Sequence, residues 1–100
     1  MEKVIISAAL AGAATRKEQN PAVPYTPKEF AEESYKCWKA GASIVHIHAR
    51  NPENGFPTGD LKIVRETITA IRDRCPELII NMSSDIGPGV NPEQRIAPIV

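Results

Sequence analysis

Three short apolar segments constrain the fold of this chain more than any other feature of its sequence. Each is apolar at consecutive positions, which is typical of a strand covered on both faces in a parallel sheet. The segments between them repeat their apolar residues at helical spacing. The order β-α-β-α-β-α therefore predicts an α/β fold with a parallel sheet and helices packed outside it. The predicted strands span residues of about 4–9, 43–49 and 77–83.

Local sequence signals predict where the helices begin. Thr26 is the expected N-cap of the first helix, with Pro27 at its first position and Glu29 completing a capping box. Asp60 or Thr58 is the expected cap of the second helix. The predicted helices span residues of about 27–40, 60–74 and from 92 onward.

Three parallel strands alone leave open edges and an uncovered core, so they make a poor free-standing domain. We therefore expect residues 1–100 to form the N-terminal βαβαβα portion of a single TIM (β/α)₈ barrel, which takes about 250 residues to close. An open doubly wound sheet is the alternative. That fold usually has a glycine-rich phosphate turn after its first strand, where this chain has only Gly12.

His46 and His48 are the candidate metal ligands. Side chains alternate along a strand, so both imidazoles and Arg50 are expected on one face of the second strand. Either histidine alone would be read as a core residue bonded to a backbone carbonyl. Two on one face favour a site for a divalent cation such as zinc. Arg50 is either a surface charge or a group that binds an anionic substrate near the metal.

Polar and small residues follow all three predicted strands, where both architectures bind their ligands. Ser83 and Ser84 are either turn residues or hydrogen-bond donors to a substrate carboxylate. Two histidines leave zinc short of a third protein ligand. Asp85 is the best carboxylate nearby, but a residue of a later strand is favoured for that place. Zinc in such a site would polarise a carbonyl or carboxylate oxygen.

Charge and cysteine content exclude several classes of partner. The 12 basic and 12 acidic residues balance, which gives no electrostatic case for binding nucleic acid or an anionic membrane. No segment approaches the roughly 20 apolar residues of a membrane span. Cys37 and Cys75 lie in predicted helices without metal or redox spacing, as expected of reduced packing residues. We expect a cytoplasmic protein.

The sequence resembles the β-keto acid cleavage enzymes along its whole length. The resemblance lies in an ordered set of motifs: Ala8–Ala13, Pro24–Pro27, Ala40–Ala42, His46–Arg50, Asn51–Gly55 and Asn81–Ser84. It implies a TIM barrel with one zinc ion per subunit, held by His46, His48 and a carboxylate from a later strand. It implies that a β-keto acid and acetyl-CoA react to give acetoacetate and a new acyl-CoA.

The same resemblance implies further roles and an assembly. Ser83 would bind the substrate carboxylate with help from Ser84, and the catalytic base would lie beyond residue 100. A homo-oligomer, either a tetramer or a dimer, is expected. The alternatives are a metal-dependent barrel hydrolase and a non-catalytic zinc-binding module with structural histidines.

The sequence departs from the family pattern in two places. Members that act on an amino-bearing keto acid carry a glutamate where this chain has Ala14. Alanine cannot pair with an ammonium group, so we expect a keto acid without an amino group there. Asp85 and Ile86 replace the usual glycines after the serine pair, which is expected to reshape the substrate loop.

Overall fold

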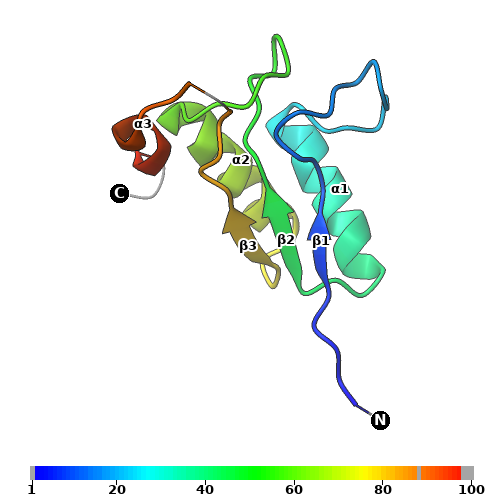
Figure 1. The fold of residues 1–100 in the computed structure, drawn as a ribbon. Helices are drawn as coiled ribbons and strands as arrows, with labels where there is room; N and C mark the ends of the chain where they lie inside the picture. Colours follow the sequence, from blue (N-terminus) through cyan, green and yellow to red (C-terminus); the bar gives the residue numbers. More distant parts are fainter. Residues whose placement is uncertain (1, 88, 98–100) are drawn as a thin grey trace.

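The computed structural model describes residues 2–87 and 89–97, which form an α/β unit around a parallel sheet (Figure 1). The sheet has three strands in the order β1-β2-β3. Figure 1 shows α1 and α2 side by side behind this sheet. The predicted parallel α/β architecture is therefore confirmed for the described residues. The elements are β1 (Ser7–Ala9), α1 (Pro27–Lys39), β2 (Ile44–Ile47), α2 (Leu61–Arg74), β3 (Ile79–Met82) and α3 (Pro92–Ile96).

The strands are shorter than the apolar segments at 4–9, 43–49 and 77–83 that predicted them. β2 begins opposite β1 at Ser7, so Val4 and Ile5 extend past the neighbouring strand and are mostly exposed. At the other end, the chain leaves the sheet after Ile47, and the Ala49 carbonyl accepts a hydrogen bond from Thr58 in the next loop. Apolar character thus predicted where each strand lies, while pairing partners decided its length.

The predicted helix caps are confirmed. The Thr26 side chain accepts from the Glu29 amide, and the Glu29 carboxylate accepts from the Thr26 amide, so the capping box is complete. Asp60 caps α2, which settles the choice between it and Thr58. Asn91 and Gln94 form a second capping box at α3. The expected continuation of this last helix past residue 97 lies outside the described residues.

The core lies between the sheet and the two long helices. Val45 and Ile47 of β2 are fully buried against Phe30 of α1 and Ile71 of α2. Because side chains alternate along a strand, His46 lies on the opposite face, which these helices do not cover. The alternation therefore buries Val45 and Ile47 in the core and leaves the His46 side chain on the face where a ligand could reach it.

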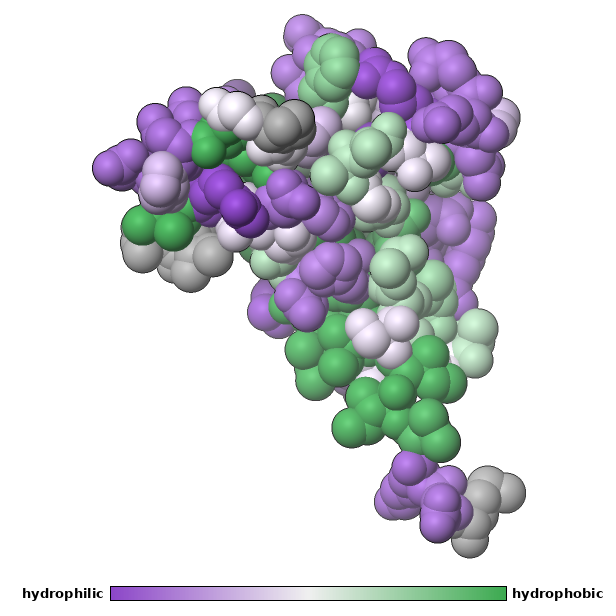
Figure 2. All heavy atoms as spheres, in the orientation of Figure 1, coloured by the Kyte–Doolittle hydropathy of each residue, from purple (hydrophilic) through white to green (hydrophobic). Residues whose placement is uncertain are grey.

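The uncovered face is apolar near the amino ends of the strands. Figure 2 shows hydrophobic side chains gathered there, and Val4, Ile5 and Ile79 are each more than half exposed. Large exposed apolar patches are uncommon on soluble proteins and are typical of interaction surfaces. Among residues 2–87 and 89–97, no helix has the length and apolar character needed to cross a membrane.

Candidate metal and substrate site

The two histidines lie together at the carboxyl end of β2. In the sheet register, Ala9 and Asn81 flank His46, so the imidazole projects from the middle strand of the uncovered face. The centroids of the His46 and His48 rings are 5.2 Å apart, and the ring planes meet edge to face at 84°. The structure therefore brings the predicted pair together. Two imidazoles at this separation are close enough to share one metal ion with modest rotation of the rings.

A backbone hydrogen bond assigns the protonation of His48. Its Nδ1 lies 3.1 Å from the carbonyl oxygen of Asp85, in the loop after β3. A carbonyl can only accept, so Nδ1 carries the proton and donates it. The Nε2 lone pair of the neutral ring is then left for a metal, which is the usual arrangement of a ligating histidine.

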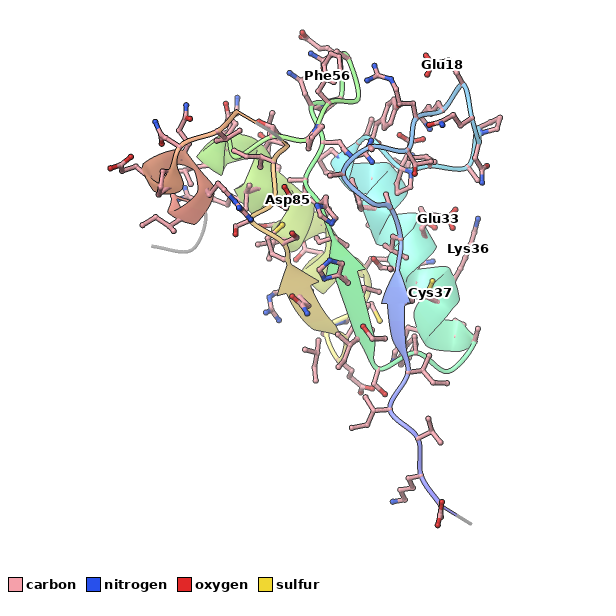
Figure 3. All side chains as sticks on the ribbon, in the orientation of Figure 1. Glu18, Glu33, Lys36, Cys37, Phe56 and Asp85 are labelled. Atoms are coloured by element: carbon pink, nitrogen blue, oxygen red, sulfur yellow. The ribbon has the colours of Figure 1, made fainter. Side chains whose placement is uncertain are left out.

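Asp85 contributes its main chain to the site, whereas its carboxylate bonds to its own loop. Oδ1 accepts a hydrogen bond from the Gly87 amide at 3.1 Å. Figure 3 shows Asp85 beyond the end of β3, next to the end of β2. In the part of the chain that the structure describes, no group of three or more His, Cys, Asp or Glu side chains is placed to hold a metal. The expectation of a third ligand from a later strand stays a prediction.

The serine pair lies at the end of the neighbouring strand. The Ser83 amide donates to the Ile47 carbonyl at 2.8 Å, which continues the β2-β3 ladder beside the histidines. The Ser83 Oγ accepts from the Asp85 amide at 3.1 Å, so its own proton is free to be donated. Ser84 lines a pocket of about 400 Å³, together with Val90 of the following loop and Pro92 of α3.

Arg50 is buried, with only 1% of its surface exposed. Its Nη1 donates to the carbonyls of Thr15 and Gly55, both at 2.9 Å, and its Nη2 donates to the Gly12 carbonyl. The Nε has no partner in the described structure. Burial lowers the pKa of the guanidinium, although arginine remains charged in proteins. Binding of an anionic substrate by Arg50 stays a prediction, and most of its donors are engaged with backbone.

A pocket of about 470 Å³ lies among the loops that follow the three strands. The Arg16 guanidinium stacks on the Phe56 ring at 4.2 Å and donates to the Asn54 carbonyl at 3.0 Å. Two of its lining residues, Ala14 and Ile86, are positions where the sequence departs from the family pattern. Loop residues such as Arg16 and Phe56 belong to no periodic sequence pattern, so the sequence did not predict that they line a pocket. The aromatic side chain of Phe56 in a turn-rich loop is a weak indication of one. The lining residues are Ala13, Ala14, Arg16, Phe56, Pro57, Ile86 and Gly87.

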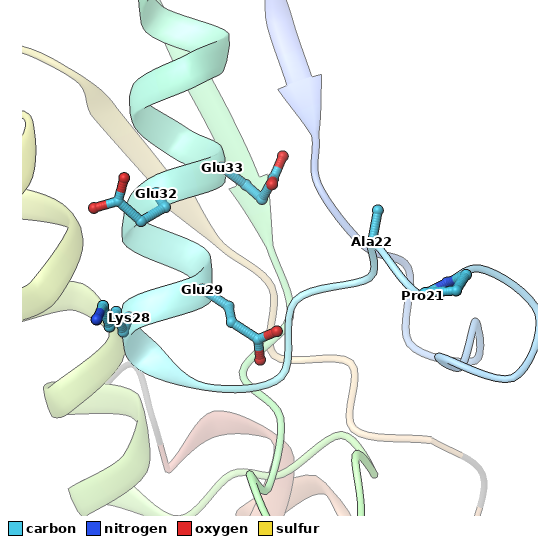
Figure 4. A pocket seen from close by; sticks show the side chains of 6 residues that line it. All are labelled: Pro21, Ala22, Lys28, Glu29, Glu32 and Glu33. Atoms are coloured by element: carbon cyan, nitrogen blue, oxygen red, sulfur yellow. The ribbon is translucent and has the colours of Figure 1, made fainter.

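Another pocket, of about 310 Å³, lies between the first turns of α1 and the preceding loop (Figure 4). Its three carboxylates are already paired. Glu29 is 2.7 Å from Lys17, Glu32 is 3.1 Å from Arg74, and Glu33 is 3.1 Å from Lys36. These contacts indicate a structural role. Its lining residues are Pro21, Ala22, Lys28, Glu29, Glu32 and Glu33.

Replacing Glu29 with glutamine is expected to make the free energy of unfolding less dependent on pH in the acidic range. Burial raises the pKa of Glu29. Hydrogen bonds from Lys17 and from the Thr26 and Tyr25 amides outweigh it and lower that pKa from 4.5 to about 2. The charged form is thus favoured by folding, and its contribution is complete above pH 4.5 and lost as the pH falls toward 2.

The side chain of Glu29 is 39% exposed, so solvent screening limits the effect to about 1 kcal/mol. Urea unfolding should show Glu29→Gln less stable than wild type at pH 7, with the difference shrinking below pH 4.5. Glu33→Gln removes an exposed pair one turn away and is the control, with an expected loss below about 0.5 kcal/mol. An equal difference at pH 7 and pH 2.5 would contradict the assignment.

Comparisons with known proteins show which family the chain is similar to. The family model described as beta-keto acid cleavage enzyme matches residues 3–100. The 3-keto-5-aminohexanoate cleavage enzyme of Fusobacterium nucleatum subsp. nucleatum is 48% identical over 98 residues, which cover 98% of this chain and 36% of the relative. The enzyme of the same name from Acetoanaerobium sticklandii is 40% identical over 99 residues, covering 99% of this chain and 36% of the relative.

A third relative has a different name. The 3,5-dioxohexanoate:acetyl-CoA acetone transferase of Paraburkholderia graminis is 33% identical over 96 residues, covering 96% of this chain and 31% of the relative. The chain thus spans about a third of the length of the curated relatives it matches. The first two relatives are named for one keto acid and the third for another. Membership of the family therefore does not identify the keto acid.

Proposed function

Because this chain belongs to the β-keto acid cleavage enzyme family, we propose that it acts in the exchange between a β-keto acid and acetyl-CoA. The products are acetoacetate and a new acyl-CoA. The observation that carries this proposal is the pair of imidazoles formed by His46, on the uncovered face of β2, and His48, just beyond the end of that strand.

The donor set of the site suits a zinc ion. His46 and His48 supply imidazole nitrogens at suitable spacing. The hydrogen bond between His48 Nδ1 and the Asp85 carbonyl leaves Nε2 as the nitrogen of His48 that would bind the metal. We propose that both hold one zinc ion, together with a carboxylate from a later strand. When bound, zinc supplies Lewis acidity that stabilises negative charge on the oxygens of the keto acid.

The reaction needs a bound substrate carboxylate, removal of a proton, transfer of the acetyl group to carbon and transfer of the new acyl group to CoA. We propose that the free Ser83 hydroxyl donates to the carboxylate of the keto acid, with Ser84 assisting. A base, expected beyond residue 100, removes a proton from the carbon between the ketone and the carboxylate. That carbon attacks the acetyl thioester and expels the CoA thiolate.

The thiolate then attacks the original ketone carbon, and the bond from that carbon to the former nucleophile breaks. The new acyl-CoA leaves, and acetoacetate takes back the proton. Atoms and charge balance without a redox partner. Negative charge develops on the oxygens of the keto acid during these steps. Groups that are already in place to stabilise this charge usually contribute much of the rate enhancement of an enzyme.

An assay of acetoacetate formation tests the function. The purified protein is expected to form acetoacetate from a β-keto acid only when acetyl-CoA is present. A barrel hydrolase would instead cleave esters or amides without CoA. A non-catalytic zinc module would bind zinc and do neither.

We also propose that this chain supplies the first three β-α units of a TIM barrel. The apolar face of the sheet, with Val4, Ile5 and Ile79 exposed, supports further strands packing against it. Cys37 and Cys75 are free thiols, which supports a reducing compartment such as the cytoplasm. For the assembly we propose a homo-oligomer, a dimer or tetramer, which sedimentation of the purified protein would test.

Replacing Ala14 with glutamate is expected to favour an amino-bearing keto acid. Ala14 lines the pocket of about 470 Å³, and no carboxylate is among the lining residues that the structure describes. A carboxylate there would pair with a substrate ammonium, and one such partly buried pair corresponds to about a tenfold change in kcat/KM. The ratio of kcat/KM for aminated and neutral keto acids measures the change. Ala14→Gln has the same length without charge and is the control; an unchanged ratio in Ala14→Glu would contradict the role of this position.

A further inference from the structure

The Arg50 side chain joins two loops that are far apart in the sequence. Its guanidinium donates to the carbonyls of Gly12 and Thr15 in the loop after β1. It also donates to the Gly55 carbonyl in the loop after β2, at 2.9 Å. A planar group with several donors can bridge carbonyls in two loops, whereas the single nitrogen of a lysine has neither the spread nor the fixed geometry.

The charge of Arg50 is held without a carboxylate among the described residues. No ion pair there includes Arg50, and only 1% of its surface is exposed. The charge is met by the three carbonyl dipoles and by the face of the Tyr25 ring, whose centroid lies 5.7 Å from the guanidinium carbon. A buried cation is costly unless it is well hydrogen-bonded, so displacing either loop from Arg50 is unfavourable.

The carbonyls bound by Arg50 adjoin the walls of the pocket of about 470 Å³. Gly12 and Thr15 flank the lining residues Ala13 and Ala14, and Gly55 precedes the lining residue Phe56. A movement of any of these carbonyls would therefore move the neighbouring wall.

Tyr25 strengthens the same connection. Its hydroxyl accepts from the Lys17 amide at 2.8 Å, which fixes a second point of the loop after β1. Its ring lies where a side chain at position 55 would have to be placed, so the loop after β2 approaches closely. The two loops are thus held against one another by Arg50 and Tyr25 together.

We infer that Arg50 is a positioning residue that sets the shape of the keto acid pocket by holding its two loops together. This inference rests on the proposed function for the identity of the ligand. In this role, which we propose in place of the expected binding of an anionic substrate by Arg50, the guanidinium acts through the loops.

Hydrogen exchange and kinetics of Arg50→Lys test this role in the full-length protein. Amides of residues 10–25 and 51–58 are expected to exchange about tenfold faster, while amides of α1 and α2 keep their wild-type rates. The KM for the keto acid is expected to rise about tenfold, with kcat changed less than threefold and zinc content unchanged. Arg74→Lys is the matched control. Arg74 pairs with Glu32 and stacks on Tyr35 at 3.5 Å, away from these loops, so its replacement should leave the KM unchanged.

A second variant covers the case in which Arg50→Lys does not fold. Tyr25→Phe keeps the ring beneath the guanidinium and removes the hydroxyl that binds Lys17. It is expected to speed exchange in residues 10–25 and to raise the KM about threefold. Loops with wild-type exchange in a folded variant, or loosened loops with an unchanged KM, would overturn the inference. A wild-type protein that makes no acetoacetate would refute the proposed function, while exchange would still decide whether Arg50 orders the loops.

Discussion

Replacing His46 with alanine is expected to remove zinc from the protein and to lower kcat/KM for acetoacetate formation more than about 100-fold. Loss of a hydrogen-bond partner of a metal ligand already costs about 10- to 100-fold in metal affinity or activity, and loss of the ligand itself should cost more. His48→Ala is expected to act in the same way, because the centroids of the two rings lie 5.2 Å apart at the end of β2. Metal analysis of the purified variants, followed by kinetics, measures both effects.

The matched control is Asp85→Ala. His48 is held by the carbonyl of residue 85, which alanine retains, and the Asp85 carboxylate bonds to the Gly87 amide. This variant is therefore expected to keep its zinc. Loss of zinc in Asp85→Ala would show that the carboxylate is a ligand, contrary to the expectation of one from a later strand. Full zinc content and activity in His46→Ala would remove the basis of the proposed site.

Replacing Gly55 with alanine is expected to lower the free energy of unfolding by about 3 kcal/mol. Gly55 has φ of +75°, where a side chain costs roughly 1–2 kcal/mol. The added Cβ would overlap the Cζ atom of Tyr25, and forcing an atom into a filled space costs about 1–3 kcal/mol more. Tyr25 cannot move away freely, because its hydroxyl binds the Lys17 amide and its ring faces Arg50.

Two other glycines separate the causes of this loss, as measured by urea unfolding. Gly41 has φ of +115°, and apart from its chain neighbours no atom of the described residues lies within 4 Å of an added Cβ, so Gly41→Ala should show the backbone cost alone. Gly12 also has open space and no positive φ, so Gly12→Ala should change stability by less than about 0.5 kcal/mol. In a Tyr25→Leu background, Gly55→Ala should cost at least about 1 kcal/mol less. Equal losses in both backgrounds would contradict the proposed clash.

Several local features could be read from the sequence because the interactions that produce them span only a few residues. The capping box of Thr26 and Glu29 depends on a spacing of three, and the structure contains it as predicted. The placement of His46 and His48 on one face follows from the alternation of side chains along a strand. The resemblance to the β-keto acid cleavage enzymes is confirmed by the match over residues 3–100.

Other features depend on contacts between distant residues. The lengths of the strands follow from which neighbours pair with them, so Val4 and Ile5 fall outside β1 although they are as apolar as its expected core. The pocket between the loops joins residues such as Ala14, Phe56 and Ile86, which no periodic pattern connects. Loop conformation is set by tertiary hydrogen bonds, and these are not encoded at a fixed spacing.

The sequence by itself determined the order of strands and helices, the helix caps and the face that carries the two imidazoles. Each of these depends on repeating geometry or on neighbours within one turn. Only the tertiary structure decided that the Asp85 carbonyl holds His48 and that Arg50 binds backbone in two loops. The physical reason is that a hydrogen bond to a backbone carbonyl requires no particular side chain at the acceptor, so the sequence carries no mark of it.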